Sequence, residues 1–226
     1  MSLKSFVLAA SSALALAAGA AAAKDSITIA MQLEPPHLDP TSAAAQAIDS
    51  VVYVNIFEGL TRFEGDGSIV PLLAKSWEIS DDGTVYTFTL QEGVTFHDGS
   101  TMDAEDVIFS LDRARAEDST NAQKALFAGI SSVEAVDPLT VKVTLAEPDG
   151  NFLFNLAWGD AVIVAPESVE NIKTAPVGTG AYKLSNWVQG DRIEVARNPD
   201  YWGEAPALAS ATFKFISDPT AAFAAM

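Results

Sequence analysis

The two histidines are the first residues to consider for chemistry, because this sequence of 226 residues contains no cysteine. His37-x-Asp39 could be half of a metal site or an acid/base pair. Zinc sites, however, use three or four protein ligands. The second histidine lies in His97-Asp98-Gly99, which is typical of a turn whose Asp side chain accepts hydrogen bonds from nearby backbone N–H groups. We therefore expect His37 and Asp39 to support a loop or border a ligand, and we predict no metal and no cofactor.

Signatures of catalysis are missing from the sequence. There is no G-x-S-x-G nucleophile elbow. Gly178-x-Gly180 is followed neither by the third glycine of a dinucleotide fingerprint nor by the Lys-Ser pair of a phosphate-binding loop. We therefore predict that the protein has no catalytic residue and is not an enzyme.

Trp158-Gly159-Asp160 is a candidate for contact with a ligand. An aromatic ring and a carboxylate beside a flexible residue can meet the side chain or the amino group of a peptide. The alternative is that Phe152, Phe154, Leu156 and Trp158 pack in a core, because large apolar side chains are mostly buried. We favour core packing for the aromatic residues and keep Trp158 and Asp160 as candidate ligand-binding residues.

A second candidate is the loop Gln32–Pro40, which follows an apolar, β-branched segment at 27–31. That segment is typical of a strand. Three prolines in the loop prevent regular structure and hold the backbone extended. Ligands of α/β sheets usually bind at the carboxyl ends of strands. The residues alone favour a ligand-binding loop and a proline-stiffened connector equally.

The elements that must position these candidates are clearest between residues 73 and 112. Trp77, a turn at Asp82-Gly83, and then Tyr86 and Phe88 at period two predict a hairpin with aromatic side chains on one buried face. Asp103 is a suitable N-cap for the helix that follows. Similar patterns predict a helix over 44–56 that ends at Gly59, hairpins over 133–145 and 182–195, strands over 60–63 and 213–216, and a helix from Pro219.

The same central segment resembles a known family. The signature of the extracellular solute-binding proteins of peptide- and nickel-type ABC importers is similar to the run Ala74, Ser76-Trp77-Glu78, Asp82-Gly83, Tyr86-Thr87-Phe88, Leu90, Gly93-Val94 and Phe96-His97-Asp98-Gly99. Two later runs also resemble hallmarks of that family: Gly178-Thr179-Gly180-x-Tyr182 and Arg197-Asn198-Pro199-x-Tyr201-Trp202. The resemblance extends from about Ile27 to Met226.

This resemblance implies an α/β fold, namely a lobe of the type II periplasmic-binding-protein class with an inserted antiparallel α+β subdomain. Residues 24–50 and 176–226 are expected to form the first lobe, which is incomplete, and 51–175 the inserted subdomain. The second lobe is expected to be absent from this chain. In the family the loop after the first strand lines the ligand cleft, so we predict ligand contacts by Leu33, Glu34, Pro35 and Pro36, together with Trp158 and Asp160.

Residues 1–23 have the features of a secretory signal peptide. Lys4 precedes an apolar segment at 6–18, and Ala21-Ala22-Ala23 offers small residues before cleavage at about Lys24. We therefore expect export to the periplasm. The net charge of −17 disfavours nucleic acid as a partner, because phosphate binding needs clustered positive charge.

Resemblance to the importer family implies a monomer that captures a short peptide and delivers it to an ABC permease in the inner membrane. Nickel, opine, oligosaccharide or glutathione are alternative ligands of the same scaffold. A secreted hydrolase and a sensor or adhesion module are alternatives of another class. Because the sequence stops barely two turns after Pro219, we also expect it to be a fragment of a longer protein or an early-terminated chain.

Overall fold

The computed structural model describes residues 25–224, so the signal peptide predicted over 1–23 lies outside the described residues. The strands are β1 Ser26–Met31, β2 Thr61–Phe63, β3 Ile69–Pro71, β4 Ala74–Ile79, β5 Val85–Leu90, β6 Ile130–Asp137, β7 Thr140–Leu145, β8 Tyr182–Val188, β9 Arg192–Arg197 and β10 Ser210–Phe215. The helices are α1 Gln46–Val52, α2 Ala104–Arg115, α3 Phe152–Asn155 and α4 Pro219–Ala224, and the 3₁₀ helices are η1 Lys124–Phe127, η2 Gly159–Ala161 and η3 Pro166–Asn171.

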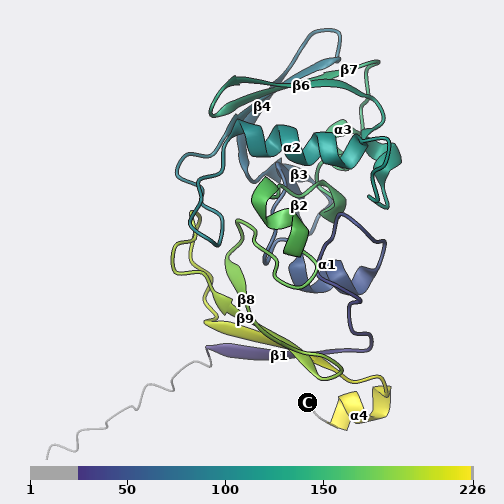
Figure 1. Ribbon diagram of the computed structural model, residues 1–226, viewed down its shortest axis with the longest axis vertical. Helices are drawn as coiled ribbons and strands as arrows, with labels where there is room; N and C mark the ends of the chain where they lie inside the picture. The colour runs from purple at the N-terminus through teal and green to yellow at the C-terminus, as the bar shows by residue number, and fades with distance from the viewer. Residues whose placement is uncertain (1–24, 225–226) are drawn as a thin grey trace, which may run out of the picture.

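A four-stranded sheet with the order β1-β10-β9-β8 forms one end of the molecule (Figure 1). β1 pairs with β10 in parallel, and the other two pairings are antiparallel. Alternate side chains of β9 and β10 are buried, among them Ile193, Val195 and Phe213, as expected for strands with one face covered. These residues belong to the same hydrophobic cluster as the buried face of α1. This cluster is called the lower core.

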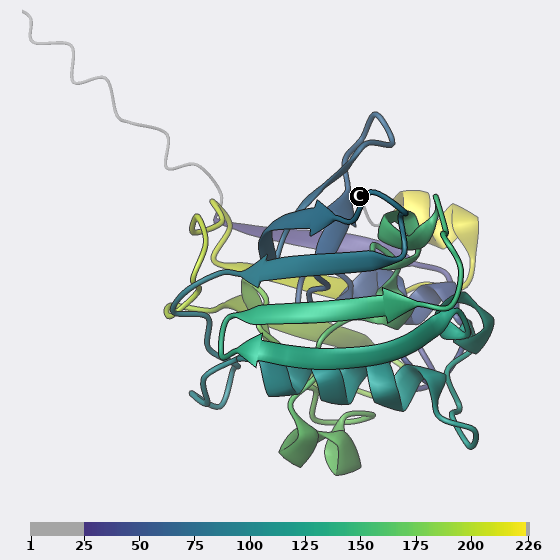
Figure 2. The same ribbon diagram turned by 90° about the horizontal axis from the view of Figure 1, so that it is seen from above.

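A second four-stranded sheet, with the order β4-β5-β7-β6, lies at the opposite end and is antiparallel throughout. α2 packs along one face of this sheet (Figures 1 and 2). The predicted hairpin is confirmed: β4 pairs with β5, Gly83 has a φ of +71°, and Tyr86 and Phe88 are buried. Trp77 is partly buried and packs against the hydrophobic cluster that contains the buried side chains of this sheet and of α2. This cluster is called the upper core.

The start of α2 is also as predicted. The Asp103 side chain accepts a hydrogen bond from the backbone N–H of Glu105 at 2.8 Å, and the Asp106 carboxylate accepts one from the backbone N–H of Asp103 at 2.9 Å. This reciprocal pair satisfies backbone donors that a helix N-terminus leaves free. Val107 and Leu111 then face the upper core.

The helix predicted over 44–56 is shorter in the structure, and the prediction that it ends at Gly59 is wrong. α1 ends at Val52, because Tyr53 is extended and Val54 has a φ of +59°. This reversal directs Ile56 and Phe57 into the lower core, where both are fully buried. Tertiary packing therefore overrides the helical periodicity. Gly59 instead makes an isolated bridge with Val162.

One segment, residues 161–165, lies between the two cores and is extended after Ala161, the last residue of η2. Ala161, Ile163 and Ala165 belong to the upper core, whereas Val162 and Val164 belong to the lower core. This alternation is the two-residue period of an extended chain buried on both sides. The segment follows directly on Trp158-Gly159-Asp160 and so gives those residues a rigid support.

The division into a lobe and an inserted subdomain stays a prediction. The boundary placed between residues 50 and 51 falls within α1. Ile48 and Val51 lie on either side of that boundary, and both belong to the lower core.

The two runs that resemble family hallmarks meet at a buried carboxylate. Glu58 is fully buried and accepts hydrogen bonds from Thr179 Oγ1 at 2.8 Å, Tyr201 OH at 2.8 Å and Trp202 Nε1 at 3.0 Å. Burial raises the pKa of Glu58. Because three side-chain donors compensate for the buried carboxylate, Glu58 fastens the 178–182 and 197–202 segments to the chain that follows α1.

Within residues 25–224, no helix has the length and apolar character needed to cross a membrane.

Candidate ligand-binding face

The loop after β1 is exposed at its tip and fastened at its base. The side chain of Leu33 is 72% exposed, Pro36 is exposed and Pro35 is buried. The Glu34 carboxylate accepts hydrogen bonds from Trp187 Nε1 and from the backbone N–H of Gly190, both at 2.9 Å. Glu34 thus ties the loop to the β8–β9 hairpin, and its two oxygens are already engaged by the protein.

A hollow of about 270 Å³ lies where this loop meets the hairpin. Its lining consists of Glu34, Pro35, Pro36, Trp187 and Gln189. Three of the four predicted loop residues therefore border one hollow, and the fourth, Leu33, borders another. That neighbouring hollow, of about 290 Å³, is lined by Met31, Gln32, Leu33 and three residues of α1, namely Gln46, Ala47 and Ser50.

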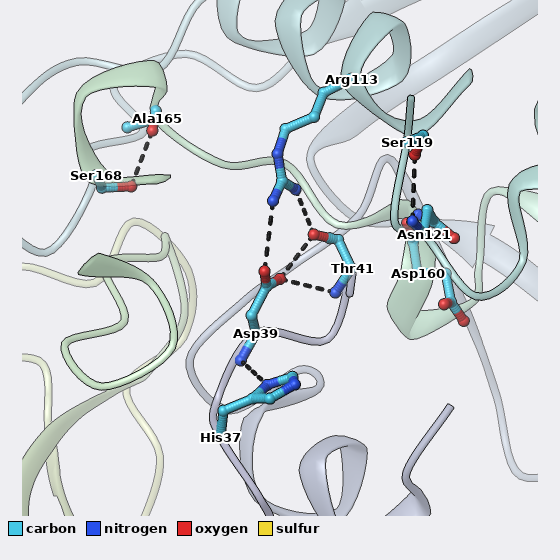
Figure 3. Close-up of polar contacts among 9 residues, drawn as sticks. All are labelled: His37, Asp39, Thr41, Arg113, Ser119, Asn121, Asp160, Ala165 and Ser168. Carbon is cyan, nitrogen blue, oxygen red and sulfur yellow. Dashed lines mark hydrogen bonds and ion pairs between the residues drawn. The ribbon is translucent and has the colours of Figure 1, made fainter. Parts of the chain in front are cut away.

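His37 and Asp39 form the structural base of the loop (Figure 3). Asp39 is 1% exposed and accepts hydrogen bonds from the backbone N–H of Thr41 at 2.9 Å and from Thr41 Oγ1 at 2.6 Å. Arg113 reaches down from α2 to Asp39, with 3.4 Å between Nη2 and Oδ2, and also donates to Thr41 Oγ1. The loop is therefore anchored to α2 by a partly buried ion pair.

His37 contributes to the same base. Its Nδ1 accepts a hydrogen bond from the backbone N–H of Asp39 at 3.2 Å, and burial lowers the pKa of His37. No three His, Cys, Asp or Glu side chains in the described part of the chain come together as metal ligands would. These contacts agree with the expectation that His37 and Asp39 support the loop.

The aromatic residues of 152–158 divide between the core and the surface. Phe152 and Leu156 are each 1% exposed, whereas Phe154 is 44% and Trp158 40% exposed. The prediction of core packing is right for the first pair and wrong for the second. The first pair is spaced i, i+4 along α3 and its end, so both face inward, while Phe154 and Trp158 lie on the other side.

Phe154 and Trp158, both exposed, form an aromatic trio with the half-buried Phe63. Their ring centroids are 5.0 Å apart for Phe63–Phe154 and 6.1 Å apart for both Phe63–Trp158 and Phe154–Trp158, all in edge-to-face geometry. Edge-to-face contacts of this kind hold aromatic rings in fixed orientations. The trio therefore gives the surface a rigid aromatic wall.

Asp160 follows Trp158 by two residues in the chain. Its side chain is on a residue only 8% exposed, and Oδ1 is buried without a hydrogen-bond partner. The backbone carbonyl of Asp160 accepts a hydrogen bond from Asn121 Nδ2 at 2.9 Å, which fixes the main chain. Burial, and secondly the charge of Asp49, raise the pKa of Asp160 to about 6.

Asp49 of α1 is the functional candidate that sequence reasoning missed. Its carboxylate packs directly on Gly159: a Cβ added there would lie 2.5 Å from Asp49 Oδ1. Burial also raises the pKa of Asp49. Tyr53, four residues further on, donates a hydrogen bond from its OH to the backbone carbonyl of Ala157. This bond also ties the 157–160 segment to the end of α1. No sequence signal joins Asp49 to Gly159, because the contact links segments far apart in the chain.

α1 therefore lies between the two predicted ligand segments. Gln46, Ala47 and Ser50 border Leu33, while Asp49 borders Gly159. The structure does not bring the Glu34 loop and Trp158 into direct contact. Instead, both segments lie against the same short helix, Leu33 across the hollow that it shares with α1 and Gly159 against Asp49.

Comparison with known proteins gives consistent results. The model of a family described as bacterial extracellular solute-binding proteins, family 5 (middle), matches residues 68–226. The glutathione-binding protein GsiB of Pectobacterium atrosepticum is 39% identical over 202 residues, which cover 87% of this chain and 39% of that protein. The chain thus spans about two fifths of the length of the curated relatives that it matches.

Two solved structures have similar folds. NikZ from Campylobacter jejuni, in complex with Ni(L-His), has a TM-score of 0.80 at 32% identity, over 89% of this chain and 41% of that chain. The periplasmic binding protein DppA from Helicobacter pylori, in complex with the peptide STSA, has a TM-score of 0.81 at 28% identity, over 88% of this chain and 44% of that chain.

Proposed function

The chain belongs to the bacterial extracellular solute-binding proteins of family 5, and from this membership we propose that it is the substrate-binding component of an ABC importer. The predicted fold class, an α/β lobe of the type II periplasmic-binding-protein class, is confirmed by the TM-scores of about 0.8. In this proposal the protein works as a monomer in the periplasm, captures short peptides and delivers them to a permease in the inner membrane.

The observation that supports a peptide most directly is the exposed loop at the carboxyl end of β1. Leu33 and Pro36 are exposed, and the loop is held in place by its prolines and by the hydrogen bonds of Glu34. A backbone with a fixed conformation offers carbonyl groups to an extended ligand at little entropic cost. Pro35 and Pro36 lack N–H groups, so they accept hydrogen bonds but do not donate them.

Transport follows from differential binding. A ligand held on this face gains further contacts only if another part of the protein closes over it, and these contacts shift the population toward the closed form. The permease then recognises the closed form. The protein does not alter the ligand, because recognition requires only contacts and no bond is broken.

Glutathione is a second candidate ligand, because a relative with 39% identity is named for binding it. Glutathione is itself a small peptide derivative, so the two candidates share charged ends and amide groups. The experiment that separates them is native mass spectrometry of the full gene product, purified from the periplasm of its source bacterium. We expect one bound short peptide for each protein molecule. Bound glutathione alone would replace the first candidate by the second, and a bound metal complex or sugar would refute both.

A further inference from the structure

Asp49 and Asp160 are two carboxylates without a cation. Neither forms an ion pair with a Lys, Arg or His in the described part of the chain. Arg62, which precedes Phe63 in β2, is paired with Glu64 at 2.7 Å. Arg113 is engaged with Asp39, and in Figure 3 the Asp160 carboxylate points away from the Arg113 guanidinium. Buried carboxylates are normally paired, so a group of this kind needs an explanation.

The Oδ1 atom of Asp160 is the clearest sign of an unmet interaction. It is buried on a residue that is only 8% exposed, and it accepts no hydrogen bond from any residue that the structure describes. Asp49 is less buried than Asp160, and its carboxylate lies against Gly159, the residue before Asp160. Leaving such an acceptor unsatisfied destabilises the folded protein.

The segment that carries Asp160 also carries exposed aromatic side chains. Trp158, which precedes Gly159 directly, is 40% exposed and is held in place by its edge-to-face contacts with Phe63 and Phe154. An aromatic face beside a carboxylate suits a flexible aliphatic stem that ends in a positive charge, because the stem packs on the ring while the charge meets the acid.

We propose that Trp158, Asp49 and Asp160 form a subsite for the basic side chain of a bound peptide, a lysine or an arginine. This inference rests on the proposed function and states the ligand chemistry of the same face. The aliphatic stem packs on Trp158, and the charged head donates hydrogen bonds to Asp49 at the mouth and to Asp160 behind it. Gly159 is required between them, because any side chain there would displace the Asp49 carboxylate.

The experiment compares two peptides that differ only in charge: Ala-Lys-Ala and Ala-norleucine-Ala, measured by calorimetry with the full gene product. Norleucine keeps the stem of lysine and lacks the ammonium group. We expect the lysine peptide to bind at least about tenfold more tightly, which corresponds to about 1.4 kcal/mol. In Asp49→Asn and Asp160→Asn this preference should fall to less than about threefold, with the affinity for the norleucine peptide unchanged.

The matched control is Asp81→Asn, which removes one exposed acid at the β4–β5 turn, far from α1 in the fold. This variant should keep the full preference for lysine. Trp158→Ala should weaken both peptides to a similar degree, because it removes stem packing and leaves the acids in place. Circular dichroism establishes that each variant is folded before its affinity is measured.

The outcomes separate this inference from the proposed function. Equal affinity for the two peptides, or a preference that survives in both Asn variants, would overturn the subsite and leave the proposed function standing. No binding of either peptide would overturn both. A preference that acetylation of the peptide N-terminus abolishes would show that the acids hold the terminal ammonium group, and would overturn the assignment to a side chain.

Discussion

Replacing Gly180 with alanine tests how closely the 178–182 segment packs on the chain after α1. A Cβ at Gly180 would lie 2.3 Å from the carbonyl oxygen of Asn55, whereas real Cβ contacts are essentially never shorter than 3.0 Å. The two segments must then separate by about 0.7 Å or more, the difference between these distances. The atom in the way is backbone, so no flexible side chain can absorb the shift.

The cost follows from the hydrogen bonds at this contact. The backbone N–H of Gly180 donates to Ile56 and that of Tyr182 donates to Asn55, each at 2.9 Å. Weakening both bonds costs about 1 kcal/mol each, and strain at the contact adds to this. We therefore expect a loss of about 3 kcal/mol. For a folded unit of about 200 residues, this lowers the midpoint of thermal unfolding by about 6–12 °C.

Gly129→Ala is the matched control. A Cβ at Gly129 meets no heavy atom within 4 Å, and its φ is not positive. Its unfolding midpoint should stay within about 2 °C of the parent protein. The two variants are compared by differential scanning calorimetry. If Gly180→Ala unfolded at the same temperature as Gly129→Ala, the close backbone contact described here would be refuted.

Three further predictions concern strain, pH and the buried carboxylate. Val54→Gly should raise the unfolding midpoint, because a β-branched residue at a φ of +59° costs about 1–2 kcal/mol, and a lower midpoint would contradict this. Burial lowers the pKa of His97 to about 4 from 6.5, so the unfolded chain binds more protons between these values and stability is lost as pH falls through that range. His97→Gln should therefore show a smaller drop in midpoint from pH 7 to pH 5, and an unchanged drop would count against it. Glu58→Ala should cost about 2–4 kcal/mol, and Tyr201→Phe should then cost almost nothing further; additive losses in chemical denaturation would exclude the hydrogen bond between them.

Local pattern was sufficient for the central hairpin and the helix after it. The turn at Gly83, the alternation of Tyr86 and Phe88 and the cap at Asp103 depend on residues close in sequence, and the structure has all of them as predicted. A period of two or a capping side chain carries its own physical reason, which does not depend on distant segments.

Long-range packing decided the features that local pattern missed. α1 ends at Val52 because Ile56 and Phe57 are needed in the core, although their spacing continues a helical stripe. Asp49 meets Gly159 only because the extended segment after Asp160 runs between the two cores. Neither the end of α1 nor the contact between Asp49 and Gly159 can be predicted from the residues close to it in the sequence.

The candidate site was predictable in part for the same reason. The loop after β1 could be identified from its prolines and its place after a strand, and Leu33 and Pro36 are exposed as a ligand-binding loop requires. Glu34 was predicted to contact the ligand, and the structure shows that its carboxylate holds the β8–β9 hairpin. Whether these residues contact ligand stays a prediction.

Isothermal titration of the full gene product with short peptides, followed by mass analysis of the recovered ligand, tests the proposed capture of peptides most directly. We expect one peptide to bind for each protein molecule and to be recovered with its mass unchanged. No detectable binding, or recovery of a cleaved peptide, would contradict the proposal that this face holds a solute for transport without altering it.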